Sequence, residues 1–503
     1  MAPALLMGDV VARNAASFPQ RRAAWLAGRS LTHLELDRQA DAMAARLREA
    51  GLGYGDRLVV WSDTCLEVLP LFVACARLGA IFAPLNARLS VEEAHPLVAM
   101  AKPALLAADS ARADGLAQIA GTLGIRRCAL FARPPQSGVA EPADATWLDL
   151  DAAAREPVLA PVREPSLREE DPQVIFFTSG STGAPKGVVL SHRANFLRSY
   201  QGAFFAEPER CVCMFPLFHM AGFTLAMGAW QTGGEIALVA QASAAEILGA
   251  VQATGANRLY CIPAVWNRIL ETDPAAFAVD SLRVIDTGTS ATPLELLQRL
   301  KTRFPGRLLR VFYGSTEAGS VTCLMDADVL TRPGSVGKAS PLVEVRLDEA
   351  GEILARAPYL MDGYFENPAA TAEALDDGWY RTGDLGAFDA DGFLSVTGRR
   401  KELIRSGGEA VAPAEVEAVL ARHEGVAEVV VVGIPDPSWG EVVCAVVVPQ
   451  AGAEVSLEAM QEACAGLAGF KRPRRLELVE SLPRTAATGQ VQRALLVETI
   501  ASR

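Results

Sequence analysis

The stretch Thr178-Ser-Gly-Ser-Thr-Gly-Ala-Pro-Lys-Gly-Val188 decides how this chain is read. It follows the apolar run 174–177, which predicts a short buried strand. Small residues let backbone N–H groups approach phosphate oxygens, hydroxyl groups donate hydrogen bonds, and Lys186 supplies a positive charge. The lysine is spaced differently from that of the GxxxxGK[ST] loop of common NTPases. The stretch therefore predicts a phosphate loop of another kind, although a plain glycine-rich turn is the alternative.

On both sides of this stretch, helical and strand patterns alternate. Residues 32–50 predict an amphipathic helix with Thr32 and Glu35 spaced as a capping box. A buried strand is expected at 57–61 and a helix at 66–78. Further strands are expected at 236–239, 258–262, 283–286 and 309–313. Strands separated by helices predict an α/β fold with layered, largely parallel sheets.

Two regions depart from this alternation. Residues 133–172 are rich in Pro, Ala, Glu and Asp and are expected to form a surface excursion. Residues 398–408 are basic and glycine-containing, and they open a run with its own pattern. That run predicts helices at 414–423 and 457–468 and strands at 427–433 and 441–449, which suits a small α+β domain. We expect a large N-terminal domain at 1–398, a hinge at 399–403 and a small mobile domain at 404–503.

Composition excludes several classes of protein. The chain has 503 residues, half of them hydrophobic, and a net charge of −12, which argues against a nucleic-acid surface. The N-terminus lacks a basic region before its apolar run, and no apolar stretch is long enough to span a bilayer. The nine cysteines contain no CxxC pair. We therefore expect a cytoplasmic protein with reduced thiols and no transmembrane segment.

The phosphate stretch resembles that of the adenylate-forming superfamily, which contains acyl-CoA synthetases, luciferases and adenylation domains. Further segments match this family in its own order, and any one of them alone would pass for a turn or an exposed charge. They are Pro216-Leu-Phe-His219, Tyr313-Gly-Ser-Thr-Glu-Ala-Gly319, Tyr380-Arg-Thr-Gly-Asp384, Arg399, Lys401 and Ser406-Gly-Gly-Glu409. The resemblance covers essentially the whole chain.

The resemblance implies a role for each matching residue. The implied catalytic residues are Lys186, Thr182, His219, Glu317 and Gln490. The implied nucleotide- and coenzyme A-binding residues are Thr178, Ser179, Gly180, Ser181, Gly183, Gly288, Thr289, Tyr313, Gly314, Thr316, Asp384, Arg399, Lys401, Gly407 and Gly408. Glu317 and Thr178 are the implied Mg²⁺ ligands.

The resemblance also implies an acyl-CoA ligase that uses ATP, Mg²⁺ and coenzyme A. A carboxylate would attack the α-phosphate of ATP, and the coenzyme A thiol would then displace AMP after the small domain rotates about Lys401. Transfer to a carrier protein, luciferase-type oxidation and a non-catalytic nucleotide-binding relative are the alternatives. The expected partners are a small carboxylic acid and coenzyme A, and the chain is expected to be a monomer or homodimer.

Two segments depart from the family's pattern. The family ends on Pro-Arg-x-x-x-Gly-Lys, whereas this chain reads Pro483-Arg-Thr-Ala-Ala-Thr-Gly-Gln490. A neutral amide cannot neutralise developing negative charge, so adenylation is expected to be impaired while the thioester step is spared. Three explanations stay open: an enzyme fed with acyl-AMP by a partner, an introduced Lys→Gln change, or replacement of the charge by Arg484 or Arg493.

The second departure is Thr287-Gly-Thr-Ser-Ala-Thr-Pro293, where the family usually has Gly-Gly-Ala-Pro. Its additional hydroxyl groups suggest a pocket for something other than a plain alkyl chain. The residues that would border this pocket are Phe215, His219, Phe223, Trp230 and Thr289, with ordinary core packing as the alternative for each aromatic residue.

Overall fold

The computed structural model describes residues 5–132, 145–158, 160–179, 185–199, 207–273, 276–406, 409–436, 439–484 and 491–502. The chain divides into two compact units, one made of residues 1–344 and 355–380 and the other of 345–354 and 381–503. Residues 345–354 and 381–398 thus group with the second unit, and the domain boundary at residue 398 expected from the sequence stays a prediction. The hinge at 399–403 stays a prediction. Each unit is described by itself.

The first unit contains an eight-stranded sheet that carries the phosphate stretch. Five adjacent pairs, from β8 through to β7, are parallel, and β9 and β19 extend the sheet in antiparallel fashion. In order across the sheet the strands are β19 (Gly363–Tyr364), β9 (Pro185–Ser191), β8 (Pro172–Ser179), β4 (Ile81–Leu85), β3 (Arg57–Trp61), β5 (Leu105–Asp109), β6 (Arg127–Phe131) and β7 (Thr146–Asp149).

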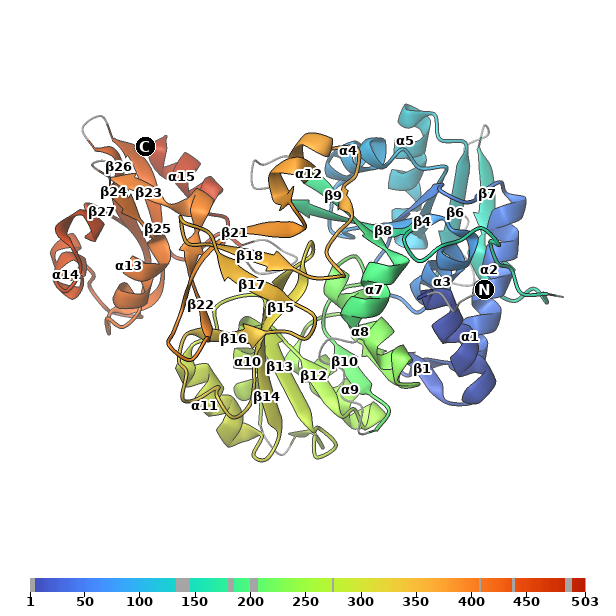
Figure 1. Ribbon diagram of the computed structural model, residues 1–503, viewed down its shortest axis with the longest axis horizontal. Helices are drawn as coiled ribbons and strands as arrows, with labels where there is room; N and C mark the ends of the chain where they lie inside the picture. The colour runs from blue at the N-terminus through green and yellow to red at the C-terminus, as the bar shows by residue number, and fades with distance from the viewer. Residues whose placement is uncertain are drawn as a thin grey trace. The chain divides into compact units, whose positions relative to one another are not determined.

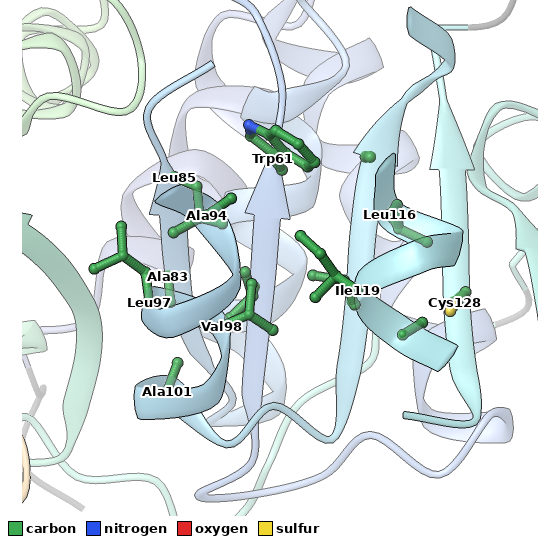
Figure 2. Packing of buried hydrophobic residues seen from close by; sticks show 14 of the residues in the cluster. Trp61, Ala83, Leu85, Ala94, Leu97, Val98, Ala101, Leu116, Ile119 and Cys128 are labelled. Carbon is green, nitrogen blue, oxygen red and sulfur yellow. The ribbon is translucent and has the colours of Figure 1, made fainter. Parts of the chain in front are cut away.

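Helices α4 (Val91–Ala101) and α5 (Ala113–Leu123) cover one face of this sheet. Figure 2 shows Val98 from α4 and Ile119 from α5 pointing onto the strands, with Trp61 at the end of its strand. These side chains are almost fully buried, and burial of apolar surface at roughly 25 cal/mol per Å² makes such a cluster the main source of local stability. This packing fixes the strands from which β8 and β9 extend.

A second sheet of the first unit carries the other site segments. Its inner strands run parallel, and β15 runs antiparallel to its two neighbours, β14 and β16. Within this unit the order is β16 (Ser335–Ala339), β15 (Gly319–Leu324), β14 (Leu308–Ser315), β13 (Val284–Gly288), β12 (Arg258–Tyr260), β10 (Arg210–Cys213), β11 (Glu235–Leu238), β1 (Arg22–Leu26) and β2 (Arg29–Thr32). Figure 1 shows β12, β13 and β14 side by side. The predicted α/β architecture with largely parallel sheets is confirmed.

Aromatic side chains connect the two sheets. Phe223 lies in α8 (Met220–Gln231), and its ring centroid is 4.6 Å from that of Phe72 in α3 (Val68–Leu78). It is also 5.5 Å from Phe82 of β4 in an edge-to-face arrangement, a favourable geometry for two rings. The remaining helices of this unit are α1 (Met7–Ser17), α2 (His33–Glu49), α6 (Leu150–Ala153), α7 (His192–Ser199), α9 (Ala244–Thr254), α10 (Pro263–Leu270), α11 (Leu294–Arg303) and α12 (Pro368–Ala374).

Most predicted elements are confirmed to within a few residues. The capping box at the start of α2 is present, because the Thr32 side chain accepts from the Glu35 N–H and the Glu35 carboxylate accepts from the Thr32 N–H. The interpretation of 133–172 as a surface excursion is wrong in part. Residues 146–149 form strand β7, which pairs in parallel with β6, and Trp147 packs against the core cluster. Residues 133–144 lie outside the described residues.

The second unit has the expected α+β character. Strand β25 (Val426–Asp436) pairs with β26 (Gly440–Pro449), and its side chains alternate between two apolar clusters. Val431 faces α13 (Pro413–Leu420) and α14 (Leu457–Ala463), whereas Val430 and Val432 face α15 (Arg493–Ala501). Helix α14 ends at Ala463, five residues before the predicted end. Its other strands include β21 (Trp379–Phe388), which pairs with β22 (Leu394–Arg399), and the shorter β23 (Ile404–Ser406), β24 (Glu409–Val411) and β27 (Arg475–Leu478).

Two chain-wide observations complete the fold. Within the part of the chain that the structure describes, no helix is long and apolar enough to cross a membrane. All nine cysteines are free thiols, and seven of them are buried.

Candidate nucleotide and acid site

The phosphate stretch forms a hairpin between two antiparallel strands of the first sheet. The register places Thr178, near the end of β8, directly opposite Lys186, near the start of β9, and Ser179 opposite Pro185. The tip of this hairpin lies outside the described residues, and with it the implied site residues Gly180, Ser181, Thr182 and Gly183. A strand thus flanks the tip on each side, whereas the common P-loop leads from a strand into a helix.

The segment with Glu317 forms the turn between β14 and β15. A register shift occurs between Tyr313 and Gly314, where the two strands come very close. A Cβ atom on Gly314 would lie 1.9 Å from the carbonyl oxygen of Gly319, so a larger residue would force the strands apart. Glu317 therefore sits at the end of a buried strand, as the sequence predicts.

Arg198, in α7, hydrogen-bonds the backbone of this turn. Its side chain is fully buried, and its guanidinium donates to the carbonyl oxygens of Thr316 at 3.0 Å and Tyr359 at 2.6 Å. Burial lowers its pKa to about 10, so it still carries its charge at neutral pH. Arg198 could not be predicted from the sequence, since no local pattern distinguishes it from other helical arginines.

A bridging segment, residues 359–365, connects the Glu317 turn to the phosphate hairpin. The Met361 N–H donates to the Glu317 carbonyl at 2.7 Å. The Asp362 N–H donates to the Val189 carbonyl at 2.9 Å, and the Phe365 N–H to the Gly187 carbonyl at 2.7 Å. Strand β19 lies inside this segment and pairs with β9. Backbone hydrogen bonds therefore fix the two nucleotide-type segments relative to each other.

Tyr364 of the bridging segment contacts both charged side chains. Its hydroxyl donates to Glu317 Oε1 at 3.1 Å, and the Lys186 Nζ atom lies 4.4 Å from the centre of its ring. Burial, followed by the charge and hydrogen bond of Glu317, raises the pKa of Tyr364. Burial and the same carboxylate raise the pKa of Tyr380. Both phenols therefore stay protonated at neutral pH. Tyr364 lies outside the motifs that the sequence offers for this site.

His219, which the resemblance places beside the acid, is the N-cap of α8. Its Nδ1 accepts from the Ala221 N–H at 3.2 Å, and its ring stacks on Phe215 with centroids 5.6 Å apart. Burial lowers the pKa of His219 to about 4, so the imidazole is neutral at physiological pH. Phe215 also meets Tyr260 edge to face at 5.3 Å. Phe215 and Tyr260 thus form an aromatic wall, and the neutral imidazole of His219 stacks on Phe215 of this wall.

Gly288 and Thr289 lie at the end of β13, beside this wall. A Cβ atom on Gly288, where φ is +152°, would lie 2.2 Å from the Phe312 carbonyl and 2.9 Å from the Tyr260 hydroxyl. Thr289 adopts a φ of +65°, a left-handed conformation that is uncommon for a threonine and that often marks functional sites.

Two residues expected to border the acid pocket belong to the core instead. Phe223 lies in the aromatic contact between the sheets, with 1% of its surface exposed. Trp230 is fully buried, and its indole N–H donates to the Ala23 carbonyl at 2.9 Å. The core alternative is therefore correct for both, because each already has a complete set of partners.

A buried ion network supports the strands that carry this wall. Asp286 of β13 accepts from Arg258 Nε at 2.7 Å and from Arg310 Nε and Nη2 at 2.8 and 2.9 Å. Arg258 also donates to both carboxylate oxygens of Glu209, at 3.0 and 3.1 Å. The four side chains carry balanced charge and are at most 8% exposed. Strands β12, β13 and β14 are thereby crosslinked just before their site ends.

The other implied nucleotide residues belong to the second unit. Asp384 and Arg399 face each other in register and form an ion pair at 3.0 Å. Arg400 pairs with Glu352 at 2.7 Å, and Lys401 follows in a short 3-10 helix. Gly407 and Gly408 lie outside the described residues, between Ser406 and Glu409, which are paired in β23 and β24. The structure thus brings Asp384 and Arg399 together.

Gln490 also lies outside the described residues, but the two arginines considered as substitutes do not. Arg493 donates to Glu417 at 2.6 and 3.1 Å and forms an ion pair with Glu402 at 3.2 Å. Arg484 pairs with Glu428. Both guanidinium groups are therefore engaged by carboxylates of their own unit, which argues against either one as a substitute for the family's lysine.

Comparisons with known proteins identify the family of this chain. The AMP-binding enzyme model matches residues 11–365, and the AMP-binding enzyme C-terminal domain model matches 415–488. Indoleacetate–CoA ligase of Aromatoleum aromaticum is 32% identical over 497 residues and covers 95% of each chain. o-Succinylbenzoate CoA synthetase of Bacillus subtilis, solved with its acyl-adenylate intermediate, has a TM-score of 0.83 at 26% identity and covers 97% of both chains. ATP-bound MatB of Rhodopseudomonas palustris has a TM-score of 0.86 at 27% identity and covers 98% of this chain and 99% of that chain.

Proposed function

Because the chain belongs to the AMP-binding enzyme family, we propose that it is an acid–thiol ligase that forms an acyl-CoA through an acyl-adenylate. The observation that carries this proposal is the assembly of Lys186, Tyr364 and Glu317, which places a cation and a carboxylate beside the phosphate hairpin. A carboxylate oxygen of the acid attacks the α-phosphorus of ATP, and the bond to pyrophosphate breaks. The sulfur of coenzyme A then attacks the acyl carbon, AMP leaves, and the thiol proton passes to solvent.

The phosphate side of the reaction needs positive charge and donors held in place. Among the described residues, Lys186 has no carboxylate within ion-pair distance, so its charge is available to phosphate oxygens. The residues fit Mg²⁺, which prefers oxygen ligands and usually takes one or two carboxylates together with substrate phosphates. Glu317 and the Thr178 hydroxyl would hold it, and the ion would neutralise phosphate charge.

The acid side needs a site that is shielded from water and does not repel a carboxylate. His219 is neutral there, and the rings of Phe215 and Tyr260 provide apolar surface. Gly288 lets the acid approach the backbone at the end of β13, where any side chain would collide with Phe312. We propose a ring-containing acid, because an aromatic wall offers favourable stacking to a flat acyl group.

In the second unit, we propose that Asp384 and Arg399 contact the ribose and that Lys401 is the hinge for the thioester step. The ion pair between Asp384 and Arg399 orients the carboxylate before a nucleotide arrives. The glycines at 407 and 408 would allow the pantetheine arm of coenzyme A to pass close to the backbone.

The Gln490 position makes the first half of the reaction the weaker half. We propose that adenylation is slowed by roughly 10²–10³ relative to a chain with lysine there, the usual cost of one lost electrostatic donor. The engagement of Arg484 and Arg493 by carboxylates supports this proposal. Such a chain would still form acyl-CoA from acyl-AMP that a partner enzyme supplies.

The decisive experiment separates the two half-reactions. Purified protein is given indole-3-acetyl-AMP and coenzyme A, and acyl-CoA is measured by chromatography. Release of the thioester is expected, and a panel of ring-containing acyl-adenylates that gives none would overturn the ligase proposal. If the acceptor is a carrier protein instead, the acyl group would pass to its phosphopantetheine thiol and not to free coenzyme A.

Acid-dependent ATP–pyrophosphate exchange tests the adenylation half. We expect slow exchange in the unaltered chain and faster exchange in Gln490→Lys. Fast exchange in the unaltered chain would refute the impairment. A non-catalytic relative would show neither exchange nor thioester formation while still binding nucleotide.

A further inference from the structure

We propose that Tyr364 is a positioning residue that holds Lys186 and Glu317 in place for Mg²⁺–ATP. This inference rests on the proposed function, since it concerns the same nucleotide site. Tyr364 lies outside the motifs that identified the site, and its role follows from its contacts alone. Its hydroxyl acts on the carboxylate and its ring acts on the ammonium, so the two effects are separable by substitution.

The hydroxyl of Tyr364 fixes one oxygen of Glu317. Tyr364 is the one side chain among the described residues that hydrogen-bonds this carboxylate, and it uses Oε1. The carboxylate is therefore held in one orientation, with Oε2 left for another ligand.

The ring of Tyr364 fixes the ammonium group of Lys186. A lysine has a long side chain that loses much rotational freedom when it binds a phosphate. An aromatic face within about 6 Å attracts a cation without neutralising it, unlike a carboxylate. At 4.4 Å from the ring centre, the ammonium is held near the hairpin with its full charge. Part of the ordering cost of phosphate binding is thus met before ATP arrives.

The backbone fixes Tyr364 itself. Its N–H donates to the Thr371 hydroxyl at 2.9 Å, and its strand pairs with β9 at Val188. The preceding Gly363 has a φ of +147°, and a Cβ atom there would lie 2.9 Å from the Thr371 side chain. Tyr364 is 9% exposed, so its ring has little room to turn. A fixed ring can position two mobile charged side chains.

The test compares Tyr364→Phe and Tyr364→Leu with the unaltered chain, by calorimetric titration with ATP in excess Mg²⁺ and in a chelator. Tyr364→Phe keeps the ring and removes the hydroxyl. In this variant, the increase in ATP affinity that Mg²⁺ produces should be about tenfold smaller than in the unaltered chain. In the chelator, the variant should bind ATP as tightly as the unaltered chain does. Tyr364→Leu removes both groups and should also bind ATP about threefold more weakly in the chelator.

Tyr359→Phe is the matched control. Tyr359 is a buried tyrosine of the same bridging segment whose hydroxyl donates to the Ser320 carbonyl at 3.0 Å, with no contact to Lys186 or Glu317. It should bind ATP as the unaltered chain does under both conditions. Melting temperatures check folding, and Tyr364→Phe alone tests the Glu317 contact if the leucine variant does not fold.

The outcomes separate this inference from the function on which it rests. An unaltered chain that binds no ATP under either condition overturns the proposed function. An unaltered chain that binds ATP, with Tyr364→Phe showing the same Mg²⁺ gain, overturns the role of the hydroxyl. If Tyr364→Leu binds ATP in the chelator as tightly as the unaltered chain or more tightly, the ring does not prepare Lys186 for phosphate.

Discussion

Replacing Asp286 with asparagine should strongly destabilise the second sheet of the first unit, whose strand β12 carries Tyr260 of the aromatic wall. Asp286 accepts three hydrogen bonds from Arg258 and Arg310, and its side chain is completely buried. Asparagine keeps the shape but removes the negative charge that Arg258 and Arg310 share. Breaking a buried pair in this way costs about 3–5 kcal/mol, because the buried guanidinium groups lose a carboxylate that compensates their charge.

The effect of this substitution should depend on pH with a defined sign. Burial raises the pKa of Asp286, but Arg310 and Arg258 outweigh it and hold the pKa below its usual value. A depressed pKa means that the stabilisation is fully present above the unfolded value, about 3.9, and is lost as the pH falls through the folded value. The free-energy difference between the unaltered chain and Asp286→Asn should therefore be constant near neutrality and shrink in acid.

Urea unfolding followed by tryptophan fluorescence measures this loss. Trp266 reports on the region, since its indole N–H donates to the Asp286 carbonyl at 3.0 Å. Asp280→Asn is the matched control, because Asp280 is exposed and pairs with Arg307 at the surface; its midpoint should hardly move. The double variant Asp286→Asn, Arg310→Met should lose less than the sum of its two single variants. A loss below about 1 kcal/mol in Asp286→Asn, or simple additivity, would refute the network's role.

Three other substitutions test the site. Arg198→Met should weaken ATP binding several-fold by releasing the Thr316 carbonyl, whereas Arg193→Met, at the surface of the same helix, should not; equal affinities measured by titration would contradict this. Gly288→Ala should abolish thioester formation and cost about 1–3 kcal/mol in urea unfolding, because its methyl group meets the Phe312 carbonyl, while Gly255→Ala also has a positive φ but open space and should stay active. Glu402→Gln should change the ratio of thioester formation to pyrophosphate exchange by loosening Arg493 beside the predicted hinge, and an unchanged ratio would argue against a hinge there.

Local patterns predicted most of the architecture. The capping box of α2 and the apolar run of β3 fall where the sequence places them, because each depends on neighbouring residues alone. Strand β7 was missed since its four residues lie beside a Pro- and Ala-rich stretch, and only pairing with β6 makes them a strand.

The site divides in the same way. Motif residues such as Lys186 and Glu317 lie at the strand ends that the sequence indicates. Tyr364 and Arg198 could not be predicted, because their contacts join segments 47 and 118 residues apart in sequence. Strand β19 positions Tyr364 and helix α7 positions Arg198 for these contacts, and no local sequence pattern indicates them.

The burial of the cysteines has a practical consequence for every assay proposed above. Desolvation raises the pKa of Cys323, which is partly exposed, to about 12, and it also raises the pKa of Cys65, the other thiol that is not fully buried. Disulfide reagents react with the thiolate form, which is scarce for such groups at neutral pH. A colorimetric thiol reagent should therefore count the coenzyme A consumed with little background from the native enzyme. A chromogenic burst on adding urea would in turn report unfolding, so a single dye can follow both turnover and stability.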